Sequence, residues 1–285
     1  MSIDFEDVGF CYNKGLPFEK WALRNIDLTV ENHEILGVVG PTGSGKSTLL
    51  QLMNGILLPS VGRVKIDGQE TSKLKGKELT KLRRKVGLVF QFPEDQVFEN
   101  TVLEDVSFGP RNLGIRGDEL RQRVRWAMEA MLLDHDTFAE RSPRTLSGGQ
   151  RRRVAIAGVL AMMPDYLILD EPGAGLDAEG RRQLINIMCS LRDDKGIGIV
   201  FVSHRLRDIL QVCDRVAIMA DGGIRMLDTP RGVLSSAEQL GEYGLRQPQL
   251  NRIMGQLQTT YTEMRTDVLT IEEAAAEIDR VVKIQ

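Results

Sequence analysis

A glycine-rich segment early in the chain has the residues needed to hold a phosphate chain. Residues 40–48 read Gly-Pro-Thr-Gly-Ser-Gly-Lys-Ser-Thr and match the pattern G-x-x-x-x-G-K-[ST]. An apolar run at 35–39 precedes the loop and a helical pattern follows it, so a chance glycine-rich turn is disfavoured. Backbone amides of such a loop and the next helix N-terminus attract anions. We expect Lys46 to reach the β- and γ-phosphates of a nucleotide and Ser47 to ligate Mg²⁺. The predicted nucleotide-binding residues here are Gly40, Pro41, Thr42, Gly43, Ser44, Gly45, Lys46, Ser47 and Thr48.

A second apolar segment ends in two carboxylates. Residues 167–172 read Leu-Ile-Leu-Asp-Glu-Pro. Asp170 is predicted to hold Mg²⁺ through water, and Glu171 to orient or deprotonate the attacking water. Taken alone, an acidic pair after a strand is more typical of a helix N-cap. Together with the phosphate loop it indicates phosphoryl transfer, because that chemistry needs a metal anchor opposite the loop.

A third segment, residues 146–150, reads Leu-Ser-Gly-Gly-Gln and precedes a helical pattern. It predicts a second anion-binding turn at a helix start. Because one nucleotide needs only one γ-phosphate cradle, the turn is expected to cap a nucleotide bound by a partner subunit, which implies a dimer. The alternative is a simple helix N-cap by Ser147. The basic run 151–153 is interpreted as a solvated or phosphate-facing surface. The residues predicted to contact the partner's nucleotide are Ser147, Gly148, Gly149 and Gln150.

The elements around these segments predict an α/β protein. Residues 3–12 and 22–30 alternate apolar with polar residues, as half-buried antiparallel strands do. Apolar runs at 35–39, 166–169 and 198–202 are typical of strands buried on both faces of a parallel sheet, and each is followed by polar residues. Ligands of such sheets bind beyond the carboxyl ends of the strands.

The chain is divided by its helical periodicity. We expect a nucleotide-binding domain over residues 1–236, with a helical insertion at about 100–164 whose clearest helix covers 116–133. The C-terminal segment, residues 237–285, carries no recognised motif and is expected to contain a helix at 271–282.

Composition narrows the class of protein. The 285 residues have a formal net charge of −3, which indicates neither a nucleic-acid-binding protein nor an acidic tail. Cys11, Cys189 and Cys213 are far apart and predict neither a disulfide framework nor a zinc site. The N-terminus has no signal-peptide pattern, and no apolar stretch approaches the ~20 residues of a membrane-spanning helix. Any association with a membrane is therefore expected to come through a protein partner.

In these three motifs and their order the chain resembles the ATP-binding cassette (ABC) subunits, over roughly its first four-fifths. The resemblance implies a P-loop NTPase of the ABC ATPase fold, with a mixed or parallel core sheet, an N-terminal antiparallel β-subdomain and an inserted α-helical subdomain. It also implies that two subunits close around two ATP molecules with Mg²⁺, hydrolyse them and reopen.

Four further residues gain a role only from this resemblance. Tyr12 resembles the aromatic residue that stacks on adenine, and Gln91 the glutamine that contacts Mg²⁺ and senses the transmembrane partner. His204 is similar to the histidine that contacts the γ-phosphate, and Asp177 to the aspartate that communicates across the dimer. Without the resemblance, Tyr12 is an ordinary strand aromatic and His204 an isolated histidine.

Residues 90–98 and 101–110 closely resemble the energy-coupling factor ATPases of bacterial micronutrient importers, and residues 15–19 resemble the second of the two paired ATPases. The resemblance implies a heterodimer with a second ATPase, bound as a peripheral protein to the cytoplasmic side of the cell membrane beneath a transmembrane coupling protein. That protein is shared by vitamin-binding membrane subunits, and no nucleic acid is involved. The C-terminal segment 237–285 is then expected to extend the dimer contact.

Four apolar side chains are expected to line the groove for the coupling protein's helices, unless they pack in the core instead. They are Val97, Phe98, Val102 and Leu103. Gly173 and Ala178 stand where the family usually has threonine and proline. Neither change removes a phosphate, metal or water ligand, so we expect altered flexibility at the dimer seam and retained hydrolysis.

Two rival functions use the same fold. A soluble cassette ATPase that remodels ribosomes or DNA is disfavoured by the single cassette, the near-neutral charge and the lack of a long heptad pattern. A regulatory nucleotide-binding module without hydrolysis is disfavoured because both Glu171 and His204 are present.

Overall fold

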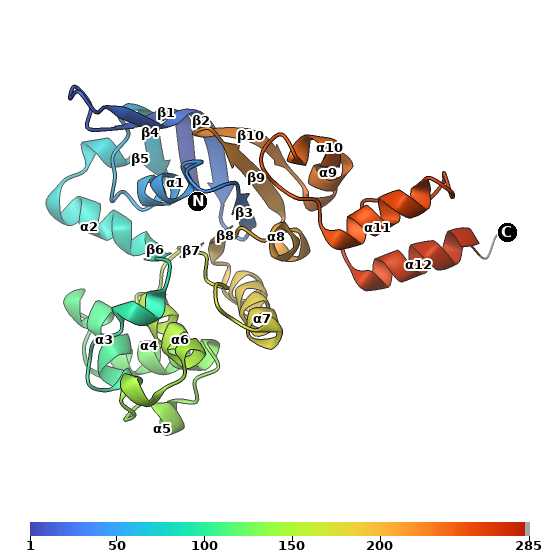
Figure 1. Ribbon diagram of the computed structural model, residues 1–285. Helices are drawn as coiled ribbons and strands as arrows, with labels where there is room; N and C mark the ends of the chain where they lie inside the picture. The colour runs from blue at the N-terminus through green and yellow to red at the C-terminus, as the bar shows by residue number, and fades with distance from the viewer. Residues whose placement is uncertain (283–285) are drawn as a thin grey trace.

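The computed structural model describes residues 1–282, which form two β-sheets and a set of surrounding helices (Figure 1). The antiparallel sheet has the order β2-β1-β4-β5. Its strands are β1 (Ser2–Tyr12), β2 (Lys20–Glu31), β4 (Val61–Ile66) and β5 (Gln69–Glu70). The two antiparallel strands expected at 3–12 and 22–30 are β1 and β2, and register shifts along β1 accompany the positive φ of Asp7, as in a β-bulge.

The six-stranded sheet has the order β10-β9-β3-β8-β7-β6 and is parallel except for β10, which pairs antiparallel with β9. Its strands are β3 (Ile35–Val39), β6 (Val86–Val89), β7 (Tyr166–Asp170), β8 (Gly198–Val202), β9 (Arg215–Ala220) and β10 (Gly223–Asp228). The three predicted buried strands are present, and β7 extends one residue further, to Asp170. The fold class expected from the sequence is confirmed.

The core lies on both faces of this sheet. Along β3, Ile35 and Val39 pack into the cluster shared with the outer helices, whereas Leu36 and Val38 pack toward the antiparallel sheet. Helix α1 (Lys46–Met53) contributes to the second cluster, between the sheets. Strand β3 is buried on both faces, and this explains its unbroken apolar run.

Between β6 and β7 the chain forms a separate helical lobe, drawn beneath the sheets in Figure 1. Its helices are α3 (Val102–Asn112), α4 (Gly117–Ala130), α5 (His135–Phe138) and α6 (Gly148–Leu160). Helix α2 precedes β6, and α7 and α8 flank β8. Their bounds are α2 (Gly76–Lys85), α7 (Ala178–Lys195) and α8 (Leu206–Val212).

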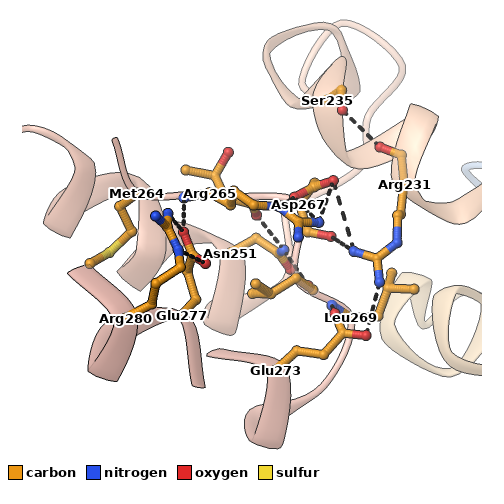
Figure 2. Close-up of polar contacts among 12 residues, drawn as sticks. Arg231, Ser235, Asn251, Met264, Arg265, Asp267, Leu269, Glu273, Glu277 and Arg280 are labelled. Atoms are coloured by element: carbon orange, nitrogen blue, oxygen red, sulfur yellow. Dashed lines mark hydrogen bonds and ion pairs between the residues drawn. The ribbon is translucent and has the colours of Figure 1, made fainter. Parts of the chain in front are cut away.

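The C-terminal segment ends in a helical hairpin with a small core of its own, at the right in Figure 1. Helix α9 (Pro230–Ser235) precedes the segment, which contains α10 (Ala237–Leu240) and the two helices of the hairpin, α11 (Gln249–Gln258) and α12 (Ile271–Val282). Figure 2 shows how polar contacts fasten the hairpin: Arg231 of α9 donates to the Asp267 carbonyl at 3.1 Å and to a Glu273 carboxylate oxygen at 2.9 Å. Within the hairpin, the hydrogen bond from Arg280 lowers the pKa of Glu277 to about 2.

No helix within residues 1–282 combines the length and apolarity that crossing a bilayer requires.

Candidate nucleotide-binding and hydrolysis site

The phosphate loop connects β3 to α1, and its backbone explains its glycines. Gly43 and Gly45 have φ of 84° and 100°, a region that other residues rarely adopt. A Cβ on Gly45 would lie 2.7 Å from the Ala22 carbonyl oxygen, so this residue must be glycine for the loop to pack on β2. A Cβ on Gly43 would meet nothing within 4 Å, so this part of the loop borders open space. The loop is therefore tightly packed against β2 at Gly45 and open to a ligand at Gly43.

Two polar groups of the loop are poised for an anion. The Lys46 ammonium donates to the carbonyl oxygens of Gly40 at 2.7 Å and Pro41 at 2.9 Å, so it folds back over the loop. Burial lowers the pKa of Lys46, against the opposing charges of Glu171 and Asp170. The Ser44 hydroxyl is buried and has no hydrogen-bond partner. A bound phosphate would supply acceptors for both groups.

Three side chains at one end of the phosphate loop have oxygen atoms that could hold a metal ion. The Ser47 hydroxyl donates to an Asp170 carboxylate oxygen at 3.3 Å, and Gln91 lines the same cavity. Burial raises the pKa of Asp170, opposed by Ser47 and Lys46. Hydroxyl, amide and carboxylate oxygens are hard donors that suit Mg²⁺, which also takes substrate phosphates and waters. Within the described residues no group of three His, Cys, Asp or Glu is placed so that it could hold a metal ion.

Glu171 and His204 face each other beyond β7 and β8. A Glu171 carboxylate oxygen lies 2.7 Å from Nδ1 of His204, and the Glu171 side chain is 13% exposed whereas that of His204 is 65% exposed. Glu171 has a φ of 50°, and its amide donates to the Val202 carbonyl at 3.1 Å. A non-glycine residue held in this conformation indicates that the surrounding structure fixes the backbone at this position.

One cavity of about 1180 Å³ brings together the predicted residues of the phosphate loop, except the buried Ser44, with Tyr12, Gln91, Asp170, Glu171 and His204. The Tyr12 hydroxyl lies 3.1 Å from the Thr48 hydroxyl, which ties the aromatic residue to the start of α1. Sequence reasoning missed other lining residues, because nothing in their local pattern marks them. These are Glu19, Lys20, Trp21, Ala22, Arg24, Asp221, Gly222, Gly244 and Leu245.

The last two of these come from the C-terminal segment. A Cβ built on Gly244 would lie 3.7 Å from Pro41 of the phosphate loop, and Leu245 packs on the main core. The segment after residue 236 therefore reaches the nucleotide cavity as well as forming the hairpin.

The Leu-Ser-Gly-Gly-Gln turn lies elsewhere. Ser147 and Gln150 form a reciprocal capping box at the start of α6, with bonds of 3.2 and 3.0 Å, so the helix-cap interpretation describes part of its role. The turn borders a second cavity, of about 540 Å³, together with Asp177, which caps α7 through the Gly180 amide. A Cβ on Gly148 would meet no atom within 4 Å, so the turn also offers a free surface.

The interpretation of the basic run 151–153 as a surface is wrong for Arg152. Its side chain is buried, donates to Glu94 at 2.9 and 2.6 Å and reaches the Pro172 carbonyl at 2.8 Å. Although burial acts to raise it, the pKa of Glu94 is lowered because of the hydrogen bond and charge of Arg152. This pair joins α6 to the segment after Gln91 and to the segment after Glu171.

We expect Arg152→Ala to lower the free energy of unfolding in urea by about 3 kcal/mol, because Glu94 would keep a half-buried charge without its partner. The double variant Arg152→Met with Glu94→Leu should recover part of the loss. An unfolding midpoint unchanged in Arg152→Ala would show that the pair contributes nothing to stability.

The alternative left open for the four groove residues, packing in the core, holds fully for Val102 and in part for two others. Val102 is fully buried, and Val97 and Leu103 pack against the main core. Phe98 alone of the four is exposed, at 63%, and its ring lies edge-on to that of Phe108 with centroids 4.9 Å apart. An aromatic pair therefore occupies the surface where a groove was expected.

The protein combines a phosphate loop, a strand that ends in two carboxylates and a separate glycine-rich turn. These features, on a six-stranded sheet with a helical lobe, define a cassette-type nucleotide hydrolase. Comparison with known proteins agrees: the ABC transporter family model matches residues 23–174.

Curated relatives cover nearly the whole chain. The energy-coupling factor transporter ATP-binding protein EcfA2 of Caldanaerobacter subterraneus subsp. tengcongensis is 44% identical over 98% of this chain and 97% of its own. EcfA2 of Clostridioides difficile is 42% identical over 99% of this chain and 98% of its own.

Solved structures have the same fold. CbiO1 from Clostridium perfringens, described as part of the ABC transporter complex cbiONQ, has a TM-score of 0.76 and 36% identity over 89% of this chain and 98% of that one. The dimeric cassette MJ0796, bound to ADP and Pi in a post-hydrolysis state, has a TM-score of 0.71 and 32% identity over 81% of this chain and 99% of that one.

The chain belongs to the ABC transporter family, among its energy-coupling factor transporter ATP-binding proteins. It is an ATP-binding, ATP-hydrolysing subunit that supplies energy to transport.

Proposed function

We propose that the chain pairs with a second, non-identical ATPase, and that each of two ATP molecules is held between one subunit's phosphate loop and the other's Leu-Ser-Gly-Gly-Gln turn. One observation carries the proposal: Ser147, Gly149 and Gln150 border a cavity separate from the one around Lys46, and Gly148 faces open space. A partner's nucleotide would complete the turn's anion-binding surface. The dimeric cassette MJ0796 supports the pairing.

The residues around the phosphate loop divide the chemistry between them. Tyr12 offers its ring to the base, and Lys46 and the loop amides bind the phosphates. Ser47, Asp170 and Gln91 would hold Mg²⁺, which neutralises charge on the phosphates when bound. Glu171 orients and deprotonates the attacking water, and His204, 2.7 Å from it, contacts the γ-phosphate.

Closure of the two ATPases would move a membrane coupling protein that serves vitamin-binding membrane subunits, from the cytoplasmic side of the membrane. The exposed pair Phe98 and Phe108, with exposed Phe90 and Phe92 nearby in sequence, would receive that protein's helices. Gln91 of the nucleotide cavity lies between Phe90 and Phe92 in the sequence. ATP binding and contact with the coupling protein would therefore involve the same segment of the chain. ATP binding would shift the ATPase dimer from an open to a closed conformation, and the membrane protein would change conformation in response.

The C-terminal hairpin would extend the contact between the two ATPases. Ile253 of α11 and Ile271 and Val282 of α12 are exposed by 45%, 61% and 42%. Exposed apolar side chains gathered on one small unit are typical of a protein contact.

Purification from detergent-solubilised membranes tests the proposed function. We expect the tagged chain to recover a second cassette ATPase and a polytopic membrane protein. Recovery with ribosomes or DNA instead would favour the rival, a soluble remodelling ATPase, and recovery of the chain as a homodimer would contradict the non-identical partner.

A further inference from the structure

The segment that contains α2 carries a concentrated positive charge. Residues 73–85 include seven lysines and arginines and one acid, Glu78, although the whole chain has a formal net charge of −3. Neither nucleotide binding nor the proposed aromatic contact surface uses any of these cations. The charge therefore calls for another explanation.

Packing accounts for some of it. Leu82 is buried and Leu79 packs against the core between the sheets, so one face of α2 is used by the fold. Lys85 pairs with Asp67 at 2.5 Å, and Arg83 donates to the Gly55 carbonyl at 2.7 Å. Near the start of the segment, Lys73 pairs with Glu70 at 2.7 Å. These cations have structural partners within the chain.

Three lysines have no such partner. Lys75, Lys77 and Lys81 are exposed, and none of them forms an ion pair or side-chain hydrogen bond within residues 1–282. Lys77 and Lys81 lie four residues apart on one helix face, where like charges repel. Lys75 is the N-cap residue of α2, where the helix dipole disfavours a cation. None of the three lysines contributes a stabilising contact that the structure shows, so an external anionic partner explains them better than folding does.

The position of α2 indicates which partner. Helix α2 leads directly into β6, and β6 leads to Phe90, the first of the four exposed phenylalanines that are proposed to meet the coupling protein. In Figure 1, α2 and α3 lie on the side of the molecule away from the hairpin of α11 and α12. Lysines on a helix that precedes exposed aromatic side chains along the chain are typical of surfaces that meet the polar region of a bilayer.

We propose that Lys75, Lys77 and Lys81 of α2 form a contact surface for the headgroups of anionic phospholipids. The surface orients the ATPase against the bilayer while the aromatic surface meets the coupling protein. This proposal rests on the proposed location of the chain at the cytoplasmic face of a membrane. The contact is electrostatic and peripheral, because the apolar face of α2 is already packed in the protein.

Binding of the isolated full-length chain to vesicles tests the proposal. We expect the wild type to bind vesicles of equal parts phosphatidylcholine and phosphatidylglycerol, to bind pure phosphatidylcholine vesicles poorly, and to be released by 0.5 M salt. Lys75→Gln, Lys77→Gln and Lys81→Gln together should lower the partition coefficient about 100-fold, since each lysine contributes about 1 kcal/mol near an anionic surface. A matched triple variant, Arg207→Gln, Arg246→Gln and Arg252→Gln, removes three exposed charges elsewhere and should bind as the wild type does.

Equal vesicle binding by the wild type and the α2 variant would overturn the proposal. So would binding of a DNA or RNA duplex that depends on the three lysines while vesicle binding does not. The vesicles hold neither a second ATPase nor a coupling protein, so this result is independent of the proposed function. If vesicle binding is lost while ATP hydrolysis and co-purification with the membrane protein persist, the lysines act on lipid and not on assembly.

Discussion

Glu171→Gln is expected to bind ATP as the wild type does and to hydrolyse it about 10²–10⁴-fold more slowly. The amide keeps the size of the side chain and a hydrogen bond to His204, 2.7 Å away in the wild type, but it cannot accept a proton. Phosphate release under saturating MgATP measures the rate, and equilibrium binding of a fluorescent ATP analogue measures the affinity. Both are needed, because the prediction separates the two quantities.

Glu140→Gln is the matched control. Glu140 is exposed and lies in the helical lobe, away from the nucleotide cavity, so the same chemical change there should leave turnover unaltered. Turnover at the wild-type rate in Glu171→Gln would show that another group activates the water, and His204 would be the next residue to test.

Lys46→Ala is expected to weaken ATP binding about 10–100-fold and to slow hydrolysis about 10²–10³-fold. Lys46 provides the mobile cation of the loop, and its carbonyl partners in Gly40 and Pro41 would be replaced by phosphate oxygens. Isothermal titration with ATP and a phosphate-release assay measure the two effects.

Lys46→Met separates charge from packing, because it keeps the length of the side chain. It should behave as the alanine variant does if the charge is what matters. Retention of wild-type affinity in both variants, with an unchanged melting temperature, would remove Lys46 from the nucleotide site.

The apolar runs in the sequence predicted the strands that position the residues of the site. The runs at 35–39 and 198–202 match β3 and β8 at both ends, because strands buried on both faces have no polar residues to blur their limits. The loop between Gly40 and Gly45 was equally clear, since its glycines are required by backbone conformation and close packing.

Contacts between distant parts of the chain were not predictable in this way. The ion pair of Arg152 with Glu94 joins residues 58 positions apart, and from sequence Arg152 is indistinguishable from Arg151 and Arg153, which are only partly buried. Likewise, Gly244 meets Pro41 only because the C-terminal segment folds back over the sheet. The burial of Val102 was left open between groove and core because residue type alone does not distinguish the two.

The two departures from the family pattern remain predictions. A Cβ on Gly173 would lie 3.5 Å from the Arg181 side chain, an ordinary contact, so the structure has room for the family's usual threonine there. Ala178 opens α7 directly after Asp177. Neither position touches the residues around Lys46, so we expect hydrolysis to be retained.

A structure of the Glu171→Gln variant, assembled with its partner ATPase and loaded with MgATP, tests the account most directly. We predict that Ser147 and the amides of Gly148 and Gly149 lie within hydrogen-bonding distance of the γ-phosphate held by the partner's phosphate loop. A closed, ATP-loaded dimer in which residues 147–150 face solvent or their own helical lobe would contradict it.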